Sequence, residues 1–457
     1  MMTESQRAAL AEYAAVKGQC PARERLAALF DDGVYTETGS NLRAGENLAG
    51  VVTAYGYIGG TPAYAFSQDS TVMKGAVSLA HSAKICKMFE LAARNGVPVV
   101  GIYDSCGAFV EDGADALNAY SDILLSMGSL SGVVPMVSVI SGVCAGTMAM
   151  IASSADFSVI TEGAELYLDA SGNNASAESA AKSGAVSAYA KSDAEAMDTV
   201  RRYLSLMPQN NLSPLPEFEF DAPVSAAFDN AENAAESIAD AGSILEVYGE
   251  YGTASYTALC TVSGVTAGIA ATNKTKDKLT SADCSKIARF VRLCDAYSIP
   301  VITVADTEGF DLHGADMVRA GAALAGAYAE ASCAKIALVS GKACGMAYIA
   351  FAGRNVAADA VYALPEAVIA PMDPVSAAEF LYHDKLKGAD DLAAARSQIA
   401  KEYAENEGSA FAAAAKGAAD EVVTAENVRA AVASVLDVTA GKRLNKRLPK
   451  KHNILPL

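Results

Sequence analysis

The sequence predicts an α/β protein made of two tandem domains that share one fold. The segment SAKICKMFELAARNGVPVVGIYDSCGA at 82–108 returns as CSKIARFVRLCDAYSIPVITVADTEGF at 284–310, with Lys84 matching Lys286 at an offset of 202 positions. A second repeat follows, VISGVCAGTMA at 139–149 against LVSGKACGMAY at 338–348. So long a period indicates a duplicated domain. Helix and strand patterns alternate within each copy, which is typical of a parallel sheet.

Length and composition fit this prediction and exclude other classes. The chain has 457 residues, 52% of them hydrophobic and 19% charged, so we expect packed domains and not a disordered chain. A formal charge of -18 argues against a nucleic-acid partner. Nine cysteines without a CxxC pair indicate free thiols in a reducing cytoplasm, with no disulfide framework and no metal site. The N-terminus lacks an apolar signal core.

In the first domain we expect two helices, a hairpin and then alternating elements. The helices lie at 4–17 and 21–31, and Gly59-Gly60 turns a hairpin within 49–66. The remaining elements are helix 78–95, strand 97–103, helix 115–128, strand 134–140 and helix 144–153. The stretch 123–155 is uncharged, but Pro135, Gly142 and Gly146 interrupt it. We therefore read it as buried strand and helix and not as a membrane span.

The second domain repeats this order after a linker. A polar, proline-containing run at 208–230 indicates the linker, and we place the domains at 1–225 and 226–457. The expected elements are hairpin 256–271, helix 283–297, strand 299–305, helix 314–331, strand 335–340 and helix 345–352. The Ala-rich tail 386–437 is expected to be helical and to cap one end.

Glycine-containing turns stand where strands give way to helices. They are Asp104–Ala108, Cys144–Thr147, Asp306–Phe310 and Cys344–Ala347. A helix N-terminus leaves backbone N–H groups unpaired, and a small residue lets a ligand oxygen approach them. Two such donors stabilise a developing oxyanion. The alternative is that these glycines only allow helix and sheet to pack closely.

Few side chains are candidates for catalysis. His81 falls in a predicted helix and fits a capped or core residue and a ligand equally well. His313 lies in a polar loop that could face a pocket, and His452 lies in a basic tail. Cys106 and Cys144 have no nearby histidine in sequence to activate them. The chemistry is therefore expected to depend on the backbone.

Taken together, the segments resemble the biotin-dependent acyl-CoA carboxyltransferase family. This family includes the β subunits of propionyl- and acetyl-CoA carboxylases and the α subunits of methylmalonyl- and glutaconyl-CoA decarboxylases. The matching stretches include ARERLAALFDDG at 22–33, GVVTAYGYIGGTPAYAFSQDSTV at 50–72, VPVVGIYDSCGA at 97–108, GVVPMVSVISGVCAG at 132–146, SKIARFVRLCDAYSIPVITVADTEGF at 285–310, AYAEASCAKIALVSGKACGMAY at 327–348 and KKHNILPL at 450–457.

The resemblance implies two crotonase-like domains, each a ββα superhelix, and carboxyl transfer between biotin and an acyl-CoA. One oxyanion hole would hold the thioester enolate oxygen, in the N-terminal domain. The other would hold the biotin carbonyl oxygen, in the C-terminal domain. Biotin can handle the proton, so no protein base is required. Sites formed between subunits imply a homo-oligomer.

The resemblance also assigns site residues. Its catalytic positions align with Gly146, Thr147, Met346 and Ala347, which would act through backbone N–H groups. Its binding positions, for biotin and the coenzyme A thioester, are Cys106, Gly107, Ala108, Gly309, Phe310, Gly345 and Ile349. Cys106, Thr147 and Met346 stand where the family has glycine, Phe109 where it has arginine, and Ile349 where several members have aspartate.

Partners follow from the same resemblance. Lys74 in Val72-Met73-Lys74-Gly75 lacks the flanks of a biotinylated lysine, and no carrier domain fits this length. Biotin is therefore expected on a separate carrier protein, with a biotin carboxylase or a membrane decarboxylase subunit as a further partner. Two alternatives stay open. One is a biotin-independent crotonase-type enzyme using carboxylates such as Glu111, Asp112 and Glu308. The other is a non-catalytic paralogue in a carboxyltransferase complex.

Overall fold

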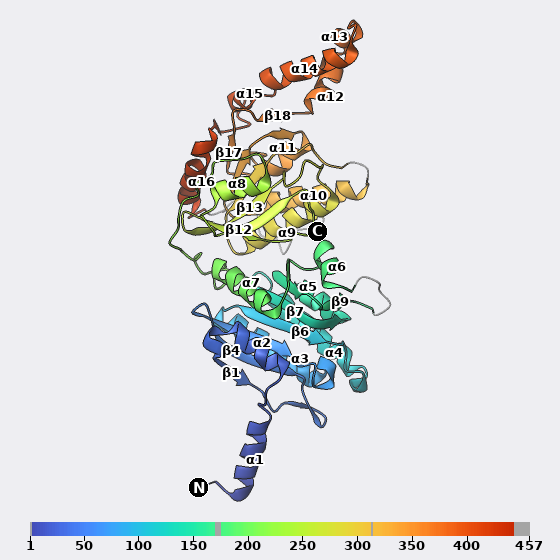
Figure 1. The fold of residues 1–457 in the computed structure, drawn as a ribbon, viewed down its shortest axis with the longest axis vertical. Coiled ribbons are helices and arrows are strands. Elements are labelled where there is room, and N and C mark those ends of the chain that lie inside the picture. Colours follow the sequence, from blue (N-terminus) through green and yellow to red (C-terminus); the bar gives the residue numbers. More distant parts are fainter. Residues whose placement is uncertain (1, 170–174, 312–313, 443–457) are drawn as a thin grey trace. The chain divides into compact units, whose positions relative to one another are not determined.

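The computed structural model describes residues 2–169, 175–311 and 314–442. The chain forms two units, Met1–Pro214 and Leu215–Leu457 (Figure 1). The unit boundary precedes the expected one at 225/226. Glu217 bridges to Val265, and the Phe218 N–H donates to the Gly264 oxygen at 2.8 Å, so this stretch belongs to the second unit.

The first unit is built on an eight-stranded sheet. Along the sheet the order is β1 (Tyr35–Thr38), β4 (Val51–Ile58), β5 (Thr61–Gln68), β6 (Val99–Ser105), β7 (Met136–Ala145), β8 (Phe157–Thr161) and β10 (Ala188–Ala190), and β9 (Glu165–Tyr167) pairs with the end of β7. The β4–β5 hairpin is antiparallel, and β5, β6, β7, β8 and β10 are parallel. A small ribbon of β2 (Arg43–Ala44) and β3 (Asn47–Leu48) lies outside the sheet.

Helices cover both faces of this sheet (Figure 1). Side chains alternate along β6, so Val99 and Tyr103 pack with α3 (Leu79–Asn95) and α4 (Asp115–Leu130). On the other face Phe157 stacks on Tyr203 of α7 (Asp193–Leu206), with ring centroids 4.3 Å apart. The remaining helices are α1 (Glu4–Ala15), α2 (Pro21–Leu29), α5 (Thr147–Ser153) and α6 (Ala177–Lys182), with short 3-10 turns η1 (Asp31–Gly33), η2 (Met73–Gly75) and η3 (Val110–Asp112).

The second unit repeats this plan with a seven-stranded sheet. Its order is β11 (Leu245–Glu246), β12 (Tyr256–Val262), β13 (Val265–Ala271), β14 (Val301–Ala305), β15 (Lys335–Val339), β17 (Ala360–Ala363) and β19 (Glu421–Val422). The β12–β13 hairpin is antiparallel and the strands after it are parallel. A separate pair, β16 (Lys342–Cys344) and β18 (Val368–Ala370), takes the place of the β7–β9 pairing.

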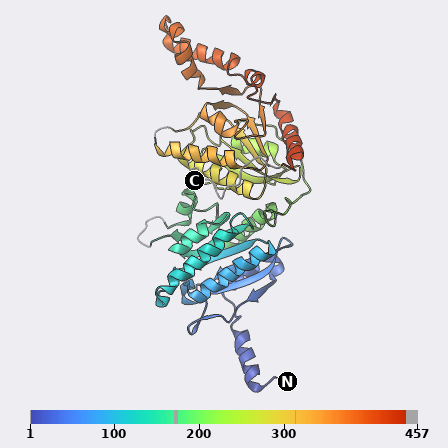
Figure 2. The ribbon, with the colours of Figure 1, turned by 180° about the vertical axis from the view of Figure 1, so that it is seen from behind.

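The helices of the second unit also cover both faces of its sheet (Figure 2). One core forms between the sheet and the helices α8 and α16, and α9 and α10 pack together on the opposite face. The predicted helical tail divides between two places, because α14 packs on α12 whereas α16 packs on α8. The helices are α8 (Ala231–Ile238), α9 (Ser281–Ala296), α10 (Asp316–Glu330), α11 (Met346–Phe351), α12 (Pro374–Leu381), α13 (His383–Lys387), α14 (Leu392–Asn406), α15 (Ala410–Ala415) and α16 (Ala425–Thr439).

Candidate functional site

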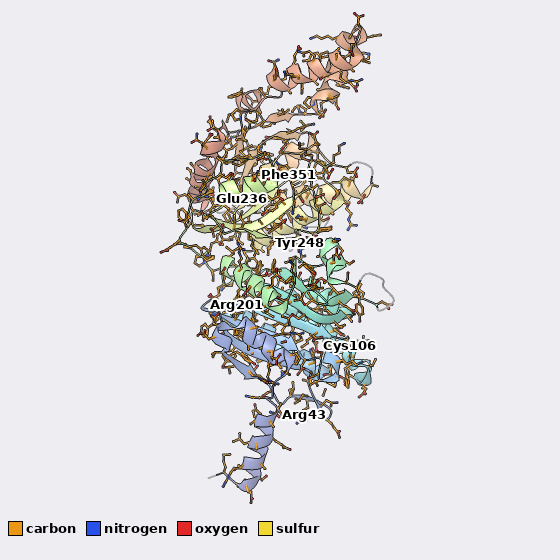
Figure 3. The ribbon with its side chains drawn as sticks, in the orientation of Figure 1. Arg43, Cys106, Arg201, Glu236, Tyr248 and Phe351 are labelled. Carbon is orange, nitrogen blue, oxygen red and sulfur yellow. The ribbon has the colours of Figure 1, made fainter. Side chains whose placement is uncertain are left out.

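In the first unit, the turn that follows β6 is tied to the segment that follows β5. The Cys106 N–H donates to the Lys74 oxygen at 3.1 Å, and the Val77 N–H donates to the Gly107 oxygen at 2.9 Å. The Gly107 N–H donates to the Ser105 hydroxyl at 3.2 Å. The turn therefore has a defined backbone path. The Cys106 side chain is exposed at the end of β6 (Figure 3).

The next amide, that of Ala108, remains available. The Gly107 oxygen and the Phe109 N–H both bond to Val77, the latter at 3.0 Å. Because successive backbone groups of an extended chain point to opposite sides, the Ala108 N–H faces the β7 side of β6. Among the residues that the structure describes, no acceptor bonds to this N–H. The Ala145 oxygen lies on the same side, 3.9 Å from the position that a Gly107 Cβ would occupy.

A second turn, at Gly146, brings another amide to this place. Gly146 has φ 65° and ψ -140°, a conformation that favours glycine. Its own N–H donates to the Tyr167 oxygen of β9 at 2.9 Å. Helix α5 begins at Thr147, and the first N–H of a helix has no intrahelical acceptor. We call Ala108 and Thr147 the first amide pair.

In the second unit, the turn after strand β14 repeats three of these bonds. The Leu279 N–H donates to the Gly309 oxygen at 3.0 Å, and the Asp311 N–H donates to the Leu279 oxygen at 2.8 Å. The Gly309 N–H donates to the Thr307 hydroxyl at 3.1 Å. By the same alternation the Phe310 N–H faces the β15 side, and it bonds to no acceptor within the described ranges.

The turn before α11 completes this second arrangement. The Gly345 N–H donates to the Ala370 oxygen of β18 at 2.9 Å, and Gly345 has φ 55°. Helix α11 begins at Met346, so the Met346 and Ala347 N–H groups are its first two donors. We call Phe310 and Met346 the second amide pair. Each unit thus presents backbone donors from two neighbouring turns.

An aspartate supports the turns in each unit, buried in the first and half-buried in the second. In the first unit Asp104 accepts from the Arg25 guanidinium at 2.9 Å and from the Ser70 hydroxyl at 2.8 Å. A Cβ on Gly142 of β7 would overlap the Asp104 carboxylate. In the second unit Asp306 stands in the same relation to Gly341. The two glycines are therefore needed for space beside the carboxylates.

The side chains at the helix starts leave the donors open. Met346 is 43% exposed, and its Cε lies where a Cβ on Gly321 of α10 would stand, so it extends along α10. Ile349 is exposed, whereas the Ala347 side chain is buried. Thr147 is half-buried. No heavy atom beyond the neighbouring residues lies within 4 Å of a Cβ built on Gly146 or Gly309. Open space therefore lies beside Gly146 and Gly309, whereas the Pro371 oxygen lies 3.1 Å from a Cβ built on Gly345.

The structure changes which of the expected residues can act as donors. The N–H groups of Gly146, Cys106, Gly107, Gly309 and Gly345 are already bonded within the protein, so these residues shape the turns but do not donate. Thr147, Met346 and Ala347 keep their amides, and Ala108 and Phe310 join them. No sequence signal marks Tyr167 or Ala370, whose oxygens occupy the glycine amides.

The titratable side chains near the turns are paired, exposed or buried. Glu308 pairs with Lys342 at 2.7 Å, and Glu111 is exposed. His81 is fully buried, and burial together with the charge of Lys84 lowers its pKa to about 3. Burial raises the pKa of the Cys144 thiol, so Cys144 is a poor nucleophile. The expected positions His313, His452 and 450–457 lie outside the described residues.

A shallow aromatic pocket lies at the other end of the first sheet. It has a volume of about 370 Å³ and is lined by Tyr55, Tyr57 and Tyr64. These residues flank the start of β5, whereas the amide pair follows the carboxyl ends of β6 and β7. The pocket is therefore separate from the candidate site.

Two kinds of feature are absent from residues 2–169, 175–311 and 314–442. In these ranges no group of three or more His, Cys, Asp or Glu side chains is arranged to hold a metal ion. None of the helices in the same ranges has the length and apolar character that crossing a bilayer requires.

Comparison with known proteins identifies relatives along nearly the whole chain. The family description "Carboxyl transferase domain" matches residues 14–455. The chain is 33% identical to the methylmalonyl-CoA decarboxylase subunit alpha of Propionigenium modestum, over 96% of this chain and 94% of that protein. It is also 33% identical to the methylmalonyl-CoA carboxyltransferase 12S subunit of Propionibacterium freudenreichii subsp. shermanii, over 96% and 92%.

Solved structures agree with the sequence comparison. A crystal structure of transcarboxylase 12S, described as a hexamer with hydrolysed methylmalonyl-coenzyme A bound, superimposes with a TM-score of 0.88. The two chains are 30% identical, and the match covers 100% of each.

Proposed function

This chain belongs to the carboxyl transferase family, and we propose that it moves a carboxyl group between an acyl-CoA and biotin carried on a separate protein. The two-domain crotonase-like fold expected from the sequence is confirmed by the similarity to transcarboxylase 12S. The chain is an enzyme of carboxyl transfer, as its family and relatives are.

The paired backbone donors in each unit carry this proposal. In the first unit, the Ala108 and Thr147 amides would bind the thioester oxygen of the acyl-CoA as it gains enolate charge. In the second unit, the Phe310 and Met346 amides, with Ala347 beside them, would bind the ureido oxygen of biotin. Donors fixed before the reaction stabilise developing negative charge without reorganisation.

The residues at the second turn fit a biotin ring. The ureido oxygen is an acceptor, and the turn offers N–H donors with open space beside Gly309. When bound, biotin supplies the nitrogen that carries the carboxyl group. The protein contributes binding, orientation and charge stabilisation at its two turns. Because the donors are main-chain groups, the replacement of family glycines by Thr147 and Met346 does not remove them.

Proline substitution tests the proposal because it removes one amide at a position where helices accept proline. We expect Thr147→Pro or Met346→Pro to lower kcat by about 10² to 10³. Thr147→Ala and Met346→Ala keep the N–H and serve as matched controls. The measurement is decarboxylation of methylmalonyl-CoA and malonyl-CoA with free biotin, alongside circular dichroism to check folding.

Two results would contradict the proposal. One is a folded proline variant that keeps the activity of its alanine control. The other is a wild-type protein that shows no biotin-dependent turnover with any carboxylated CoA ester in a panel. If turnover occurs without biotin and falls in Glu308→Gln or Glu111→Gln, side-chain acid–base catalysis accounts for it instead.

The proposal extends to partner proteins, oligomeric state and cellular location. We propose that biotin arrives on a carrier protein, with a biotin carboxylase or a membrane decarboxylase subunit as a further partner. We also propose a homo-oligomer, supported by the hexamer described for transcarboxylase 12S. All nine cysteines are free thiols, which supports a cytoplasmic location. Light scattering on the purified chain tests the oligomer.

A further inference from the structure

Three charged side chains form a cluster beside the second amide pair. The Lys342 Nζ lies 2.7 Å from the Glu308 carboxylate and also contacts the Asp373 carboxylate. The exposed fractions of the side chains are 22% for Lys342, 59% for Glu308 and 37% for Asp373. We call these three residues the Lys342 cluster. The amine thus sits near the surface and remains within reach of solvent on the Glu308 side.

Backbone bonds place this cluster at the rim of the donors. The Lys342 N–H donates to Asp306 at 2.8 Å, and the Lys342 oxygen accepts from the Thr307 N–H at 2.8 Å. Glu308 follows Thr307 and precedes the Gly309–Phe310 turn. Lys342 opens β16, which leads through Gly345 into α11.

Asp373 joins the cluster from the segment that follows β18. The Pro371 oxygen lies 3.1 Å from the position that a Gly345 Cβ would occupy, and Asp373 follows two residues later. Each of the three charged residues therefore lies within four positions of a turn residue that shapes the donor pair. The cluster is part of the same local structure.

The two carboxylates are held very differently. Asp373 is the N-cap of α12 and accepts from the Val375 N–H at 2.9 Å and from the Ser376 N–H at 3.4 Å. Glu308 has the Lys342 amine as its partner among the described residues and is the most exposed of the three. The Asp373 carboxylate is fixed by the N-terminus of α12. The Glu308 carboxylate can leave the ion pair with only a small loss of free energy.

The amine carries its charge at neutral pH. Burial lowers the pKa of Lys342, but the Asp373 and Glu308 carboxylates outweigh this and leave the pKa above its ordinary value. If another carboxylate replaced Glu308, the Lys342 amine would again face two carboxylates, so the exchange conserves its ion pairs. The exchange therefore costs little electrostatic energy.

The positions of the first unit that match Lys342 and Glu308 are uncharged. In the repeat alignment, Val143 corresponds to Lys342 and Cys106 corresponds to Glu308. In the first unit the cation beside the turn is instead Arg25 of α2, which pairs with Asp104 at 2.9 Å and with Asp193 at 3.1 Å. A lysine at this position of the turn is therefore particular to the second unit.

We propose that Lys342 binds the carboxylate group undergoing transfer in the second unit, and that Glu308 holds the place of that carboxylate until it arrives. The inference rests on the proposed function. The carboxylate could be the one on the acyl-CoA or the one carried by biotin, since both have the same charge and shape. Asp373 keeps the amine oriented throughout. Lys342 is on this account a binding residue, and no bond is made or broken at its amine.

A small carboxylate tests the site without requiring turnover. Malonate is titrated against the full chain, and binding is followed as a rise in melting temperature. We expect Lys342→Met to weaken malonate binding about ten-fold or more, because a charge-assisted hydrogen bond is lost. We expect Glu308→Gln to tighten it, because the resident competitor loses its charge. Lys416→Met, which removes an exposed lysine of the same unit, is the matched control.

Unchanged malonate binding in Lys342→Met would overturn the proposal. So would Glu308→Gln that binds malonate no more tightly than wild type, and this variant keeps Lys342 if Lys342→Met fails to fold. A fall of equal size in Lys416→Met would attribute the effect to net charge and would also overturn it.

Two further measurements identify the source of the carboxylate. If it comes from the acyl-CoA, Lys342→Met loses affinity for malonyl-CoA and keeps its affinity for acetyl-CoA. If it comes from the biotin side, both CoA esters bind as in wild type and biotin-dependent turnover falls. A wild-type protein that binds malonate through Lys342 but turns over no CoA ester would reject the proposed function alone.

Discussion

The buried side chain of His81 is connected to the first amide pair through Gln68 and Asp104. Its Nε2 lies 3.2 Å from the Gln68 Nε2, and the Gln68 Oε1 accepts the Asp104 N–H at 3.0 Å. Asp104 in turn holds the strand end that leads into the Cys106 turn. A neutral His81 can accept from Gln68, whereas a protonated ring cannot. The protonation of one core residue is therefore connected to the turn.

This connection predicts a pH dependence of stability. The folded pKa of His81, about 3, lies below its ordinary value of 6.5. Between these values the unfolded chain binds more protons, so the free energy of unfolding rises with pH by about 1.4 kcal/mol per unit. We expect stability to fall from pH 6.5 toward pH 4. Urea unfolding of wild type and His81→Gln at pH 7 and pH 5 measures this, and an identical loss in both proteins would contradict it.

At the residue scale, the sequence located the turns, and three of its four expected donors, Thr147, Met346 and Ala347, keep their N–H groups. A strand–glycine–helix pattern was enough to mark Gly146 and Gly345. Whether a particular N–H is free depends on which oxygen lies beside it. For these two residues the oxygens come from Tyr167 and Ala370, on strands whose pairing the sequence does not reveal. The Gly146 N–H is therefore bonded within the protein, whereas Thr147, Met346 and Ala347 keep their amides.

At the element scale, the strands and helices of the repeat follow from periodicity. The Gly59-Gly60 hairpin and the strands at 256–271 occur where expected. The helix expected at 144–153 begins only at Thr147, because pairing between Val143 and Glu165 keeps β7 extended to Ala145. In the segment before Thr147, strand pairing prevailed over the local preference for a helix. Helices α7 and α12 had no assignment from the sequence.

The limited space beside Asp104 and Asp306 gives a prediction about the strands. In Gly142→Ala the new methyl group would overlap the Asp104 carboxylate, so we expect a loss of about 1–3 kcal/mol in unfolding free energy. Gly341→Ala should do the same in the second unit. Gly128→Ala is the control, because its Cβ would meet nothing within 4 Å on helix α4, and it should gain about 0.5–1 kcal/mol. Thermal unfolding compares them, and equal stability of Gly142→Ala and wild type would refute the steric argument.

On the scale of the whole molecule, duplication was the most reliable signal. The constant offset between matching residues of the two repeats predicted two units with the same strand order, and the structure has them. The unit boundary was less predictable, since the linker composition continues past Pro214 while Glu217 already pairs with Val265. Composition identifies a polar segment, but it does not show which residues of that segment join a sheet.

The separate cores predict that each unit folds by itself. The first unit's cluster runs from Val51 to Val186, and the second unit's cluster runs from Phe228 to Val432. We expect fragments 1–214 and 215–457 each to unfold cooperatively on heating, because each closes its own core. Circular dichroism and limited proteolysis measure this. A fragment that melts without a transition would show that its core needs the other half.

The donors at Ala108, Thr147, Phe310 and Met346 have one consequence for how this enzyme can be studied and how it can evolve. A scan that replaces each side chain with alanine leaves every one of those four N–H groups in place and would pass over the proposed site. Drift at these positions is similarly free to alter the shape of the cavity while the donors persist. Substitutions at these positions can therefore change which substrate is accepted without passing through an inactive intermediate.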